Sequence, residues 1–316
     1  FSMVMFYLHF EKLFQEIKDS DKAIKFSKYT KPVGIVAGIM YAGVGLVPHD
    51  FNYYLHIFFA HGAFFMLGAY VLLSIIQYFG ETSISFWTGV FAAMLSVGII
   101  SYFIERFLLR HLYDKEHLIQ LLFTFALVLI IGDLTKIIWG PLQHSISYPP
   151  GFNGAINLGI IYYPTYLLFL ILFGPILALT LWLLIDHTRW GRIMKAARFD
   201  REMVGALGIN VNAVYLITFI IGSMLAGLGG ALAVPRMAIE PGMDALIIID
   251  CFVIVILGGL GSLWGSFFGA IILGVSTIFG TLLFQEWEIV VIYVLMIAML
   301  FFRPFGLFGV SDEERH

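Results

Sequence analysis

The sequence predicts an all-α protein, a polytopic transmembrane helix bundle of about eight or nine membrane segments. Hydrophobic residues make up 60% of the 316 positions and charged residues only 12%, whereas soluble domains carry about 25% charged residues. The apolar residues form continuous runs near the length of about 20 that a helix needs to cross a bilayer. These runs do not alternate apolar and polar positions, as the strands of a membrane barrel would.

Nine apolar segments follow one another along the chain. The seventh is too short to cross a membrane unless it is broken, tilted or buried in the bundle. We expect broken or re-entrant pieces near His61 and at Gly258–Gly265, where four glycines permit irregular backbone. The nine predicted segments are Val33–Val47, Ile57–Phe79, Phe86–Leu108, Leu118–Trp139, Thr165–Ile185, Val214–Val234, Ala245–Leu257, Ser266–Phe284 and Ile289–Phe302.

The distribution of Lys and Arg predicts the orientation of these segments. The loop 186–212 is the richest in both and is placed in the cytoplasm, which puts the loops 140–164 and 235–244 outside. The same count puts the charged extension 1–31 outside although it holds six lysines. Either the second segment re-enters, or Phe1–Phe10 ends an additional span.

Composition and motifs exclude several classes of protein. A net charge of −3 argues against a nucleic-acid binder, and a single cysteine against a disulfide framework. The sequence has no serine nucleophile elbow, no phosphate-binding P-loop and no His or Cys spacing typical of a metal site. We therefore predict no catalytic residue and no metal ligand in this chain.

Some ionisable residues lie inside apolar runs, where they are costly and usually face the bundle interior or a water-filled path. His61 and Asp250 are thus candidates for a pathway or a gate. The alternatives are a packing histidine with satisfied ring nitrogens and a structurally paired carboxylate. Asp133 and Lys136 stand at helical spacing, and we favour a structural pair for them.

Small residues recur at four-residue spacing in several segments, which permits close approach of helix backbones. Gly222, Ala226 and Gly230 form one such stripe, and Gly265 with Gly269 forms another. We interpret both stripes as helix-packing surfaces.

The loop 186–212 contains a stretch with good helix formers, Arg192–Leu207, followed by Gly208 as a helix stop. Met203 and Leu207 give the stretch a small apolar face beside charged residues. Such a helix either docks into a groove of a partner protein or anchors the bundle at the lipid headgroups. The pattern alone leaves both interpretations open.

This loop resembles the cytoplasmic loop of branched-chain amino acid ABC-transporter permeases. The resemblance extends over the chain from about Val33 to Gly309, and the form Asp200-Arg201-Glu202-Met203 resembles the first of the family's two paired permease types. The matching motifs are Thr188–Arg192, Ala196-Ala197, Ala206–Asn210, Ala60–Gly62 with Phe65–Tyr70, Leu257–Gly265 with Gly269, and Phe302–Gly309.

The resemblance implies a role in a larger assembly. Two ATP-binding cassette subunits, which bind the ATP and Mg²⁺, would dock beneath a pair of permeases in the plasma (inner) membrane of a prokaryote. The second permease would be a related but different chain, and an extracytoplasmic binding protein would deliver the solute. This chain would carry no cofactor and catalyse no covalent chemistry. The residues implied to dock the ATPase are Arg192, Ala196, Ala197, Asp200, Glu202, Gly205, Ala206 and Gly208.

We therefore predict a permease domain over 32–309, with a tail at 310–316, that imports a small solute by alternating access. The solute would be a branched-chain or other hydrophobic amino acid, or a related amide, urea or carboxylate. The alternative is a stand-alone ion-coupled transporter or channel that uses Asp133, Lys136 and Asp250. The predicted pathway residues are His61, Ser223, Asp250 and Cys251, with Glu240 and Asp244 at the outer mouth, and the predicted gating residues are Gly258, Gly259, Gly261 and Gly265.

Three positions depart from the family's usual pattern. Phe58 and Ala63 stand where the family usually has an asparagine and an acid, and Asp250 stands where it often has a lysine. These exchanges change the polarity of the predicted pathway, so the resemblance does not fix the amino-acid specificity.

Overall fold

The computed structural model of the chain describes residues 51–112, 115, 117–157, 162–259, 261–283, 288–303 and 305–309. The predicted segment Val33–Val47, the extension 1–31 and the tail 310–316 lie outside the described residues. Two short strands, β1 (Ala155–Asn157) and β2 (Tyr162–Pro164), pair antiparallel. The helices are α4 (Phe51–Phe79), α5 (Ser83–Phe107), the 3₁₀ turn η1 (Leu109–His111), α6 (His117–Trp139), α7 (Thr165–His187), α8 (Arg189–Phe199), α9 (Arg201–Ala206), α10 (Val211–Ala233), α11 (Met243–Gly258), α12 (Leu263–Leu283) and α13 (Glu288–Phe302).

Within the described part of the chain, six helices are long and apolar enough to cross a membrane. These spans belong to α4, α5, α6, α7, α10 and α12. The helix of the predicted seventh segment, α11, has only 16 residues, and α13 has 15. The all-α polytopic bundle is therefore confirmed.

The break predicted near His61 is wrong. Helix α4 runs without interruption from Phe51 to Phe79. The imidazole lies within reach of a side chain on α10, with its Nε2 3.4 Å from the hydroxyl oxygen of Ser223. A buried polar side chain with such a neighbour does not require the backbone to leave the helix.

The break predicted at Gly258–Gly265 is confirmed. Helix α11 ends at Gly258 and α12 begins at Leu263. Between them Gly259 has φ +94° and Gly261 has φ +83°, which are left-handed conformations that favour glycine. The α11–α12 turn thus interrupts the two apolar helices.

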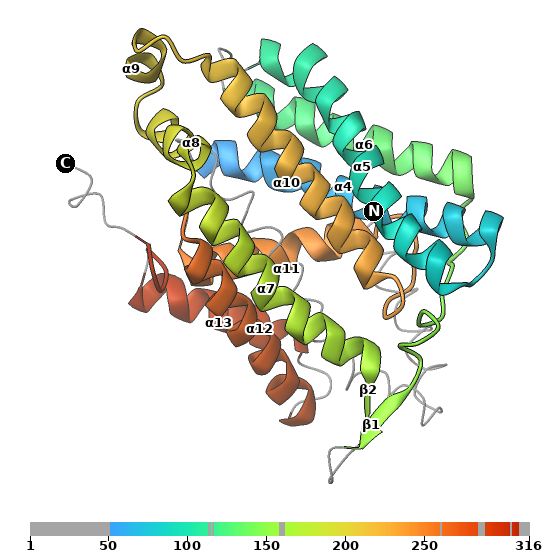
Figure 1. The fold of residues 1–316 in the computed structure, drawn as a ribbon. Coiled ribbons are helices and arrows are strands. Elements are labelled where there is room, and N and C mark those ends of the chain that lie inside the picture. The colour runs from blue at the N-terminus through green and yellow to red at the C-terminus, as the bar shows by residue number, and fades with distance from the viewer. Residues whose placement is uncertain are drawn as a thin grey trace, which may run out of the picture.

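Helices α4, α5 and α10 form the centre of the bundle (Figure 1). The backbones of α4 and α10 approach closely because glycines lie at their points of contact. A Cβ added at Gly68 of α4 would lie 2.2 Å from the carbonyl oxygen of Gly227 on α10. One added at Gly230 would lie 1.8 Å from the carbonyl oxygen of Phe65. We call these three helices the central unit.

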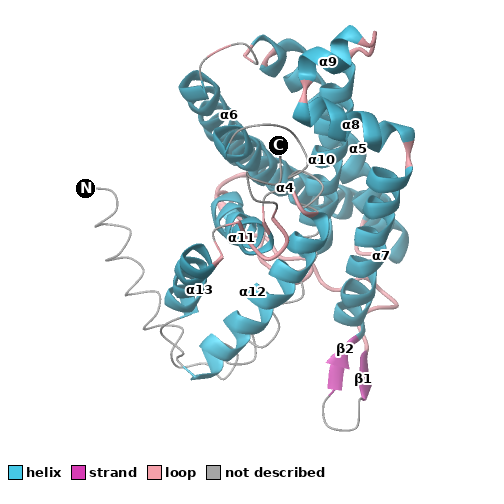
Figure 2. Ribbon diagram, turned by 90° about the vertical axis from the view of Figure 1, so that its left-hand side faces the viewer, coloured by secondary structure: helices cyan, strands magenta, loops and turns pink. Residues whose placement is uncertain are grey.

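Helices α11, α12 and α13 form a second unit with its own small apolar cluster. The cluster joins Val253, Ile254 and Leu257 of α11 to Ala270 and Leu273 of α12. Helix α11 also packs on α4, where a Cβ at Gly62 would lie 2.4 Å from a carbon of the Ile248 side chain. Figure 2 shows α12 and α13 on the side of α11 away from α5 and α8.

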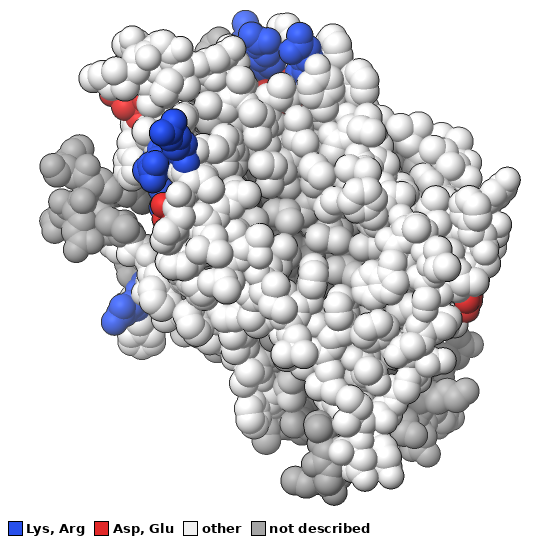
Figure 3. All heavy atoms as spheres, in the orientation of Figure 1, with Lys and Arg blue, Asp and Glu red and all other residues white. Residues whose placement is uncertain are grey.

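The loops gather at two opposite ends of the bundle (Figure 1). At the hairpin end, which carries β1 and β2, the segment before the hairpin is bound to the α10–α11 loop by paired backbone hydrogen bonds between His144 and Ile239. At the other end, which we call the α8–α9 end, lie the two short helices of the loop 186–212. Figure 3 shows basic side chains toward this end and a broad uncharged middle on the same face, as expected for a surface in contact with lipid.

Candidate functional site

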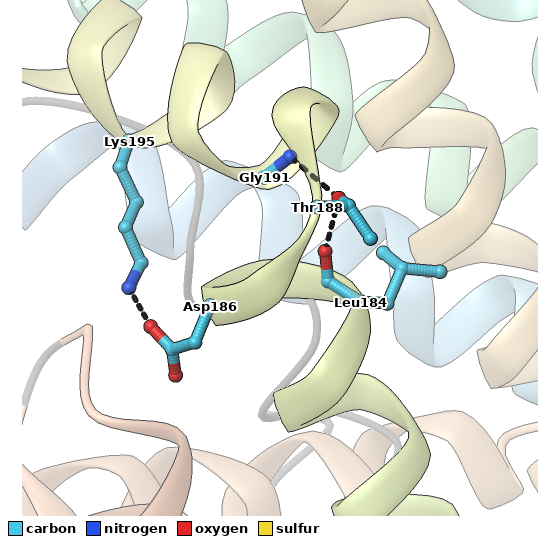
Figure 4. A network of polar contacts seen from close by, with 5 residues as sticks. All are labelled: Leu184, Asp186, Thr188, Gly191 and Lys195. Atoms are coloured by element: carbon cyan, nitrogen blue, oxygen red, sulfur yellow. Dashed lines mark hydrogen bonds and ion pairs between the residues drawn. The ribbon is translucent and has the colours of Figure 1, made fainter.

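The predicted docking loop is attached rigidly to the end of α7. The Thr188 hydroxyl caps α8 by accepting a hydrogen bond from the Gly191 amide at 3.1 Å, and it donates one to the Leu184 carbonyl (Figure 4). Lys195 forms an ion pair with Asp186 across the same corner. A Cβ at Gly191 would lie 2.1 Å from the Ile185 carbonyl oxygen. The Thr188–Arg192 motif therefore fixes the angle between α7 and α8.

The single helix predicted over Arg192–Leu207 is wrong, because the chain forms two helices with Asp200 between them. The Asp200 carboxylate accepts a hydrogen bond from the Met203 amide at 2.8 Å and so caps α9. An aspartate at this position competes with continuation of the helix. The predicted stop at Gly208 is confirmed by its φ of +81°.

Helix α10 supports both short helices from beneath. The Tyr215 hydroxyl donates a hydrogen bond to the Ala197 carbonyl at 3.4 Å. The Arg201 guanidinium lies 5.7 Å from the centre of the Tyr215 ring, within cation–π range. Tyr215 thus connects α8 and α9 to the central unit.

The eight predicted docking residues divide into two groups. Ala197 is buried against the bundle. The other seven are exposed at the α8–α9 end: Arg192, Ala196, Asp200, Glu202, Gly205, Ala206 and Gly208. Three large apolar side chains are exposed among them, Phe199 (64%), Met203 (58%) and Leu207 (71%).

The α11–α12 turn is a meeting point of three distant segments. The Leu307 amide donates to the Leu257 carbonyl at 2.9 Å and the Phe308 amide donates to the Gly258 carbonyl at 3.0 Å. The Arg198 guanidinium of α8 lies so close to Gly261 that a Cβ there would be 2.2 Å from its Nη1. The C-terminal motif and α8 therefore both contact the turn that holds the predicted gating glycines.

The predicted pathway residues form separate groups. His61 and Ser223 meet in the interior, and the imidazole also contacts the rings of Phe64 and Phe219 at 5.7 and 5.4 Å between centres. Cys251 of α11 is fully buried. Its neighbour Asp250 is partly exposed.

Asp244 is in the wall of a cavity of about 620 Å³ between α6, α11 and α13, and its backbone carbonyl lies near Gly62, the residue after His61. Asp133 and Lys136 line the same cavity and form an ion pair with 3.0 Å between Nζ and Oδ1. This confirms the pairing predicted from their spacing. Glu240, the other residue predicted at the outer mouth, is exposed on the α10–α11 loop.

Sequence reasoning missed one charged residue, Arg236, in the α10–α11 loop. Its side chain is buried, and in the described part of the chain its Nε and Nη1 have no hydrogen-bond partner. Burial lowers the pKa of the guanidinium to about 10, although Tyr148, Tyr163 and Tyr166 act in the opposite direction. A signal was present: Arg236 stands in a loop predicted to face outside, where Lys and Arg are usually depleted.

Comparison with known proteins decides the family. Residues 34–300 match the family described as branched-chain amino acid transport system / permease component. The chain is 31% identical over 269 residues to the permease protein BraD of Pseudomonas aeruginosa, which covers 81% of this chain and 87% of that one. It is 29% identical over 271 residues to LivH of Escherichia coli K12, with the same coverage.

This chain belongs to the branched-chain amino acid transport permeases. The second permease protein named for this system in Escherichia coli K12, LivM, is 27% identical, with 64% of its length covered. The more complete matches to BraD and LivH agree with the predicted permease type. The chain is thus a translocation subunit of an ABC importer, and the matches do not favour the ion-coupled alternative.

Proposed function

We propose that this permease forms, with a second permease, the pathway of an importer for branched-chain amino acids in the inner membrane of a prokaryote. The names of the relatives support the solute class, since BraD and LivH are permease proteins of high-affinity branched-chain amino acid transport systems. Because the Escherichia coli system names both LivH and LivM, the second permease is proposed to be a related but different chain. Competition of leucine uptake by unlabelled small amides, ureas and carboxylates would distinguish the wider solute class.

The proposal places the α8–α9 end in the cytoplasm and the hairpin end outside, where a soluble binding protein delivers the solute. Two ATP-binding cassette subunits, which hold ATP and Mg²⁺, dock on α8 and α9. The single observation that carries this assignment is the exposed apolar cluster Phe199, Met203 and Leu207. A partner groove covers such a surface well.

Docking fits this surface better than lipid anchoring does. Asp200 and Glu202 are exposed on the same short helical segment as the apolar cluster. Carboxylates are repelled by the negative surface potential of a cytoplasmic leaflet, whereas they can pair with basic groups of a protein groove. On α9 the acids thus favour a protein partner, because Arg201 contacts the Tyr215 ring and the other lysine and arginine residues of the loop lie on α8.

The attachments of α8 and α9 supply a route by which docking moves the bundle. Tyr215 joins them to α10, and the Arg198 contact joins α8 to the α11–α12 turn. Movement of the ATPases is proposed to act through these contacts on Gly258, Gly259, Gly261 and Gly265. The solute is proposed to pass His61, Ser223, Asp250 and Cys251, with Glu240 and Asp244 at its entrance.

The test is a double variant, Glu202→Lys with Gly208→Trp, assayed for uptake of radiolabelled leucine and for co-purification of the ATP-binding cassette subunits. We expect both to be lost while thermal stability stays near that of a matched control. The control is Gly140→Trp, since Gly140 has φ +84° and, like Gly208, no atom within 4 Å of an added Cβ. It imposes the same backbone strain at the hairpin end. Unchanged leucine uptake in the double variant would contradict the docking proposal.

A further inference from the structure

A cavity of about 540 Å³ lies at the hairpin end, apart from the α8–α9 end and from the cavity that holds Asp244. Three segments distant in sequence form its wall. Glu81 comes from the α4–α5 turn, Tyr148 and Asn153 from the segment before the hairpin, and Arg236 from the α10–α11 loop. The cavity thus depends on the tertiary fold and not on one loop.

Arg236 is the unusual member of this wall. Its side chain and backbone together are only 8% exposed, and neither Nε nor Nη1 has a hydrogen-bond partner among the residues that the structure describes. Within the described residues, no ion pair joins it to an acid. A buried guanidinium in this condition is costly, because desolvation is not offset by pairing.

The neighbours of Arg236 do not satisfy it. The Tyr166 hydroxyl already donates to the Leu232 carbonyl at 2.7 Å. The ring of Tyr148 packs on that of Tyr166 with 5.4 Å between centres. The local backbone is fixed, since the Arg236 amide donates to the Ala233 carbonyl at 3.0 Å. The guanidinium is therefore held in place, and its Nε and Nη1 keep hydrogen-bonding capacity that the described residues do not use.

We propose that Arg236 binds the carboxylate of a small solute that enters this cavity before translocation. A guanidinium matches a carboxylate because its planar fork donates two parallel hydrogen bonds. Glu81 lines the same cavity and offers an opposite charge to the ammonium group of an amino acid. The site would therefore favour a zwitterion over its amide or its amine.

The recessed position of Arg236 favours a small solute over an acidic side chain of the binding protein. A protein side chain would have to reach Arg236 with its own backbone held outside the cavity, whereas a volume of about 540 Å³ accepts a whole small solute. The identity of the solute as a branched-chain amino acid rests on the proposed function. The preference of the cavity for a carboxylate does not depend on the proposed function.

The test measures ligand-induced thermal stabilisation of the intact transporter in lipid nanodiscs, without the binding protein. The probes are leucine, 4-methylpentanoate, which lacks the ammonium group, and leucinamide, which lacks the carboxylate. Wild type should be stabilised by leucine and 4-methylpentanoate but not by leucinamide. In Arg236→Gln the apparent affinity for both carboxylates should fall about 30-fold or more, and Arg236→Lys should recover part of it.

A second measurement separates binding from structure. Arg236→Gln removes an unpaired buried charge, so the ligand-free variant should melt no lower than wild type. A lower melting temperature without a change in carboxylate affinity would mean that Arg236 is structural. Arg110→Gln, at an exposed arginine of η1, is the matched control and should leave all three probes unchanged.

The remaining outcomes decide between the two proposals. If wild type imports no leucine but still prefers 4-methylpentanoate over an amide, the proposed solute fails and the carboxylate site stands. If Arg236→Gln binds both carboxylates like wild type and only its association with the binding protein weakens, the carboxylate site is overturned. In that case the guanidinium contacts the protein.

Discussion

The central unit and the α8–α9 end are held together by different means. In the central unit, the backbones of α4 and α10 meet at Gly68, Gly227 and Gly230, and side chains of α4, α5 and α10 pack onto glycines where α5 contacts the other two helices. At the α8–α9 end, the two short helices are held by helix caps, an ion pair, a cation–π contact and the hydrogen bond from the Tyr215 hydroxyl to the Ala197 carbonyl. Close packing of the backbones allows the helices of the central unit only one arrangement. The few polar contacts at the α8–α9 end can be broken and formed again. The difference indicates a rigid central unit, which we call the frame, with an attachment that can move at α9, since α8 is held to α7 at Gly191.

The largest effect should come from breaking the frame. Gly230→Ala places a Cβ 1.8 Å from the Phe65 carbonyl oxygen, and neither backbone can give way without separating α10 from α4. We expect destabilisation of about 3 kcal/mol or more. Thermal unfolding of the purified protein and its yield from size-exclusion chromatography measure it.

The matched control is Gly132→Ala in α6, where an added Cβ meets nothing within 4 Å. This change should be neutral or stabilise the helix by up to about 1 kcal/mol. Equal behaviour of the two variants would show that backbone contact is not what holds the frame.

The sequence predicts the helices of the frame better than it predicts the contacts between distant segments that form the candidate sites. Periodicity and length identify the apolar helices, and the small-residue stripe at Gly222 and Gly230 identifies a packing face, because both signals are local. The stripe does not say that Gly230 meets Phe65, since that contact depends on how α4 and α10 cross.

The same limit applies to the candidate sites. Gly261 is recognisable as a turn residue, but its contact with Arg198 joins segments about 60 residues apart in a way no spacing rule encodes. The position of Arg236 in a loop predicted to face outside is a sequence signal, but its burial becomes apparent only when Tyr148 and Tyr166 are placed around it. The break at Asp200 was open to prediction, since aspartate is a preferred N-cap. The residues on either side of Asp200 favour a helix, so the pattern predicts one continuous helix there.

An intermediate effect should come from the α11–α12 turn. Gly261→Ala forces a side chain into a backbone of φ +83° and against the Arg198 guanidinium. We expect a loss of about 1–3 kcal/mol in stability and a several-fold loss of leucine uptake while the ATP-binding cassette subunits still co-purify.

Gly242→Ala provides the control for backbone strain alone. Gly242 has φ +101° and no atom within 4 Å of an added Cβ, so it should show the stability loss without displacing α8. If both variants lose uptake equally, the Arg198 contact does not carry movement to the turn.

The smallest effect should come from the cap between α8 and α9. Asp200→Ala removes the acceptor of the Met203 amide, which typically costs about 1 kcal/mol. Since α9 has only six residues, loss of one cap should fray the whole helix, and hydrogen exchange of its amides should rise about fivefold. Asn210→Ala removes an equivalent cap, the acceptor of the Ala213 amide at 3.1 Å. It does so from the 23-residue α10, where packing in the frame should confine the fraying to the first turn. Similar exchange across α9 and α10 in the two variants would contradict the distinction between a frame held by volume and an attachment held by polar contacts.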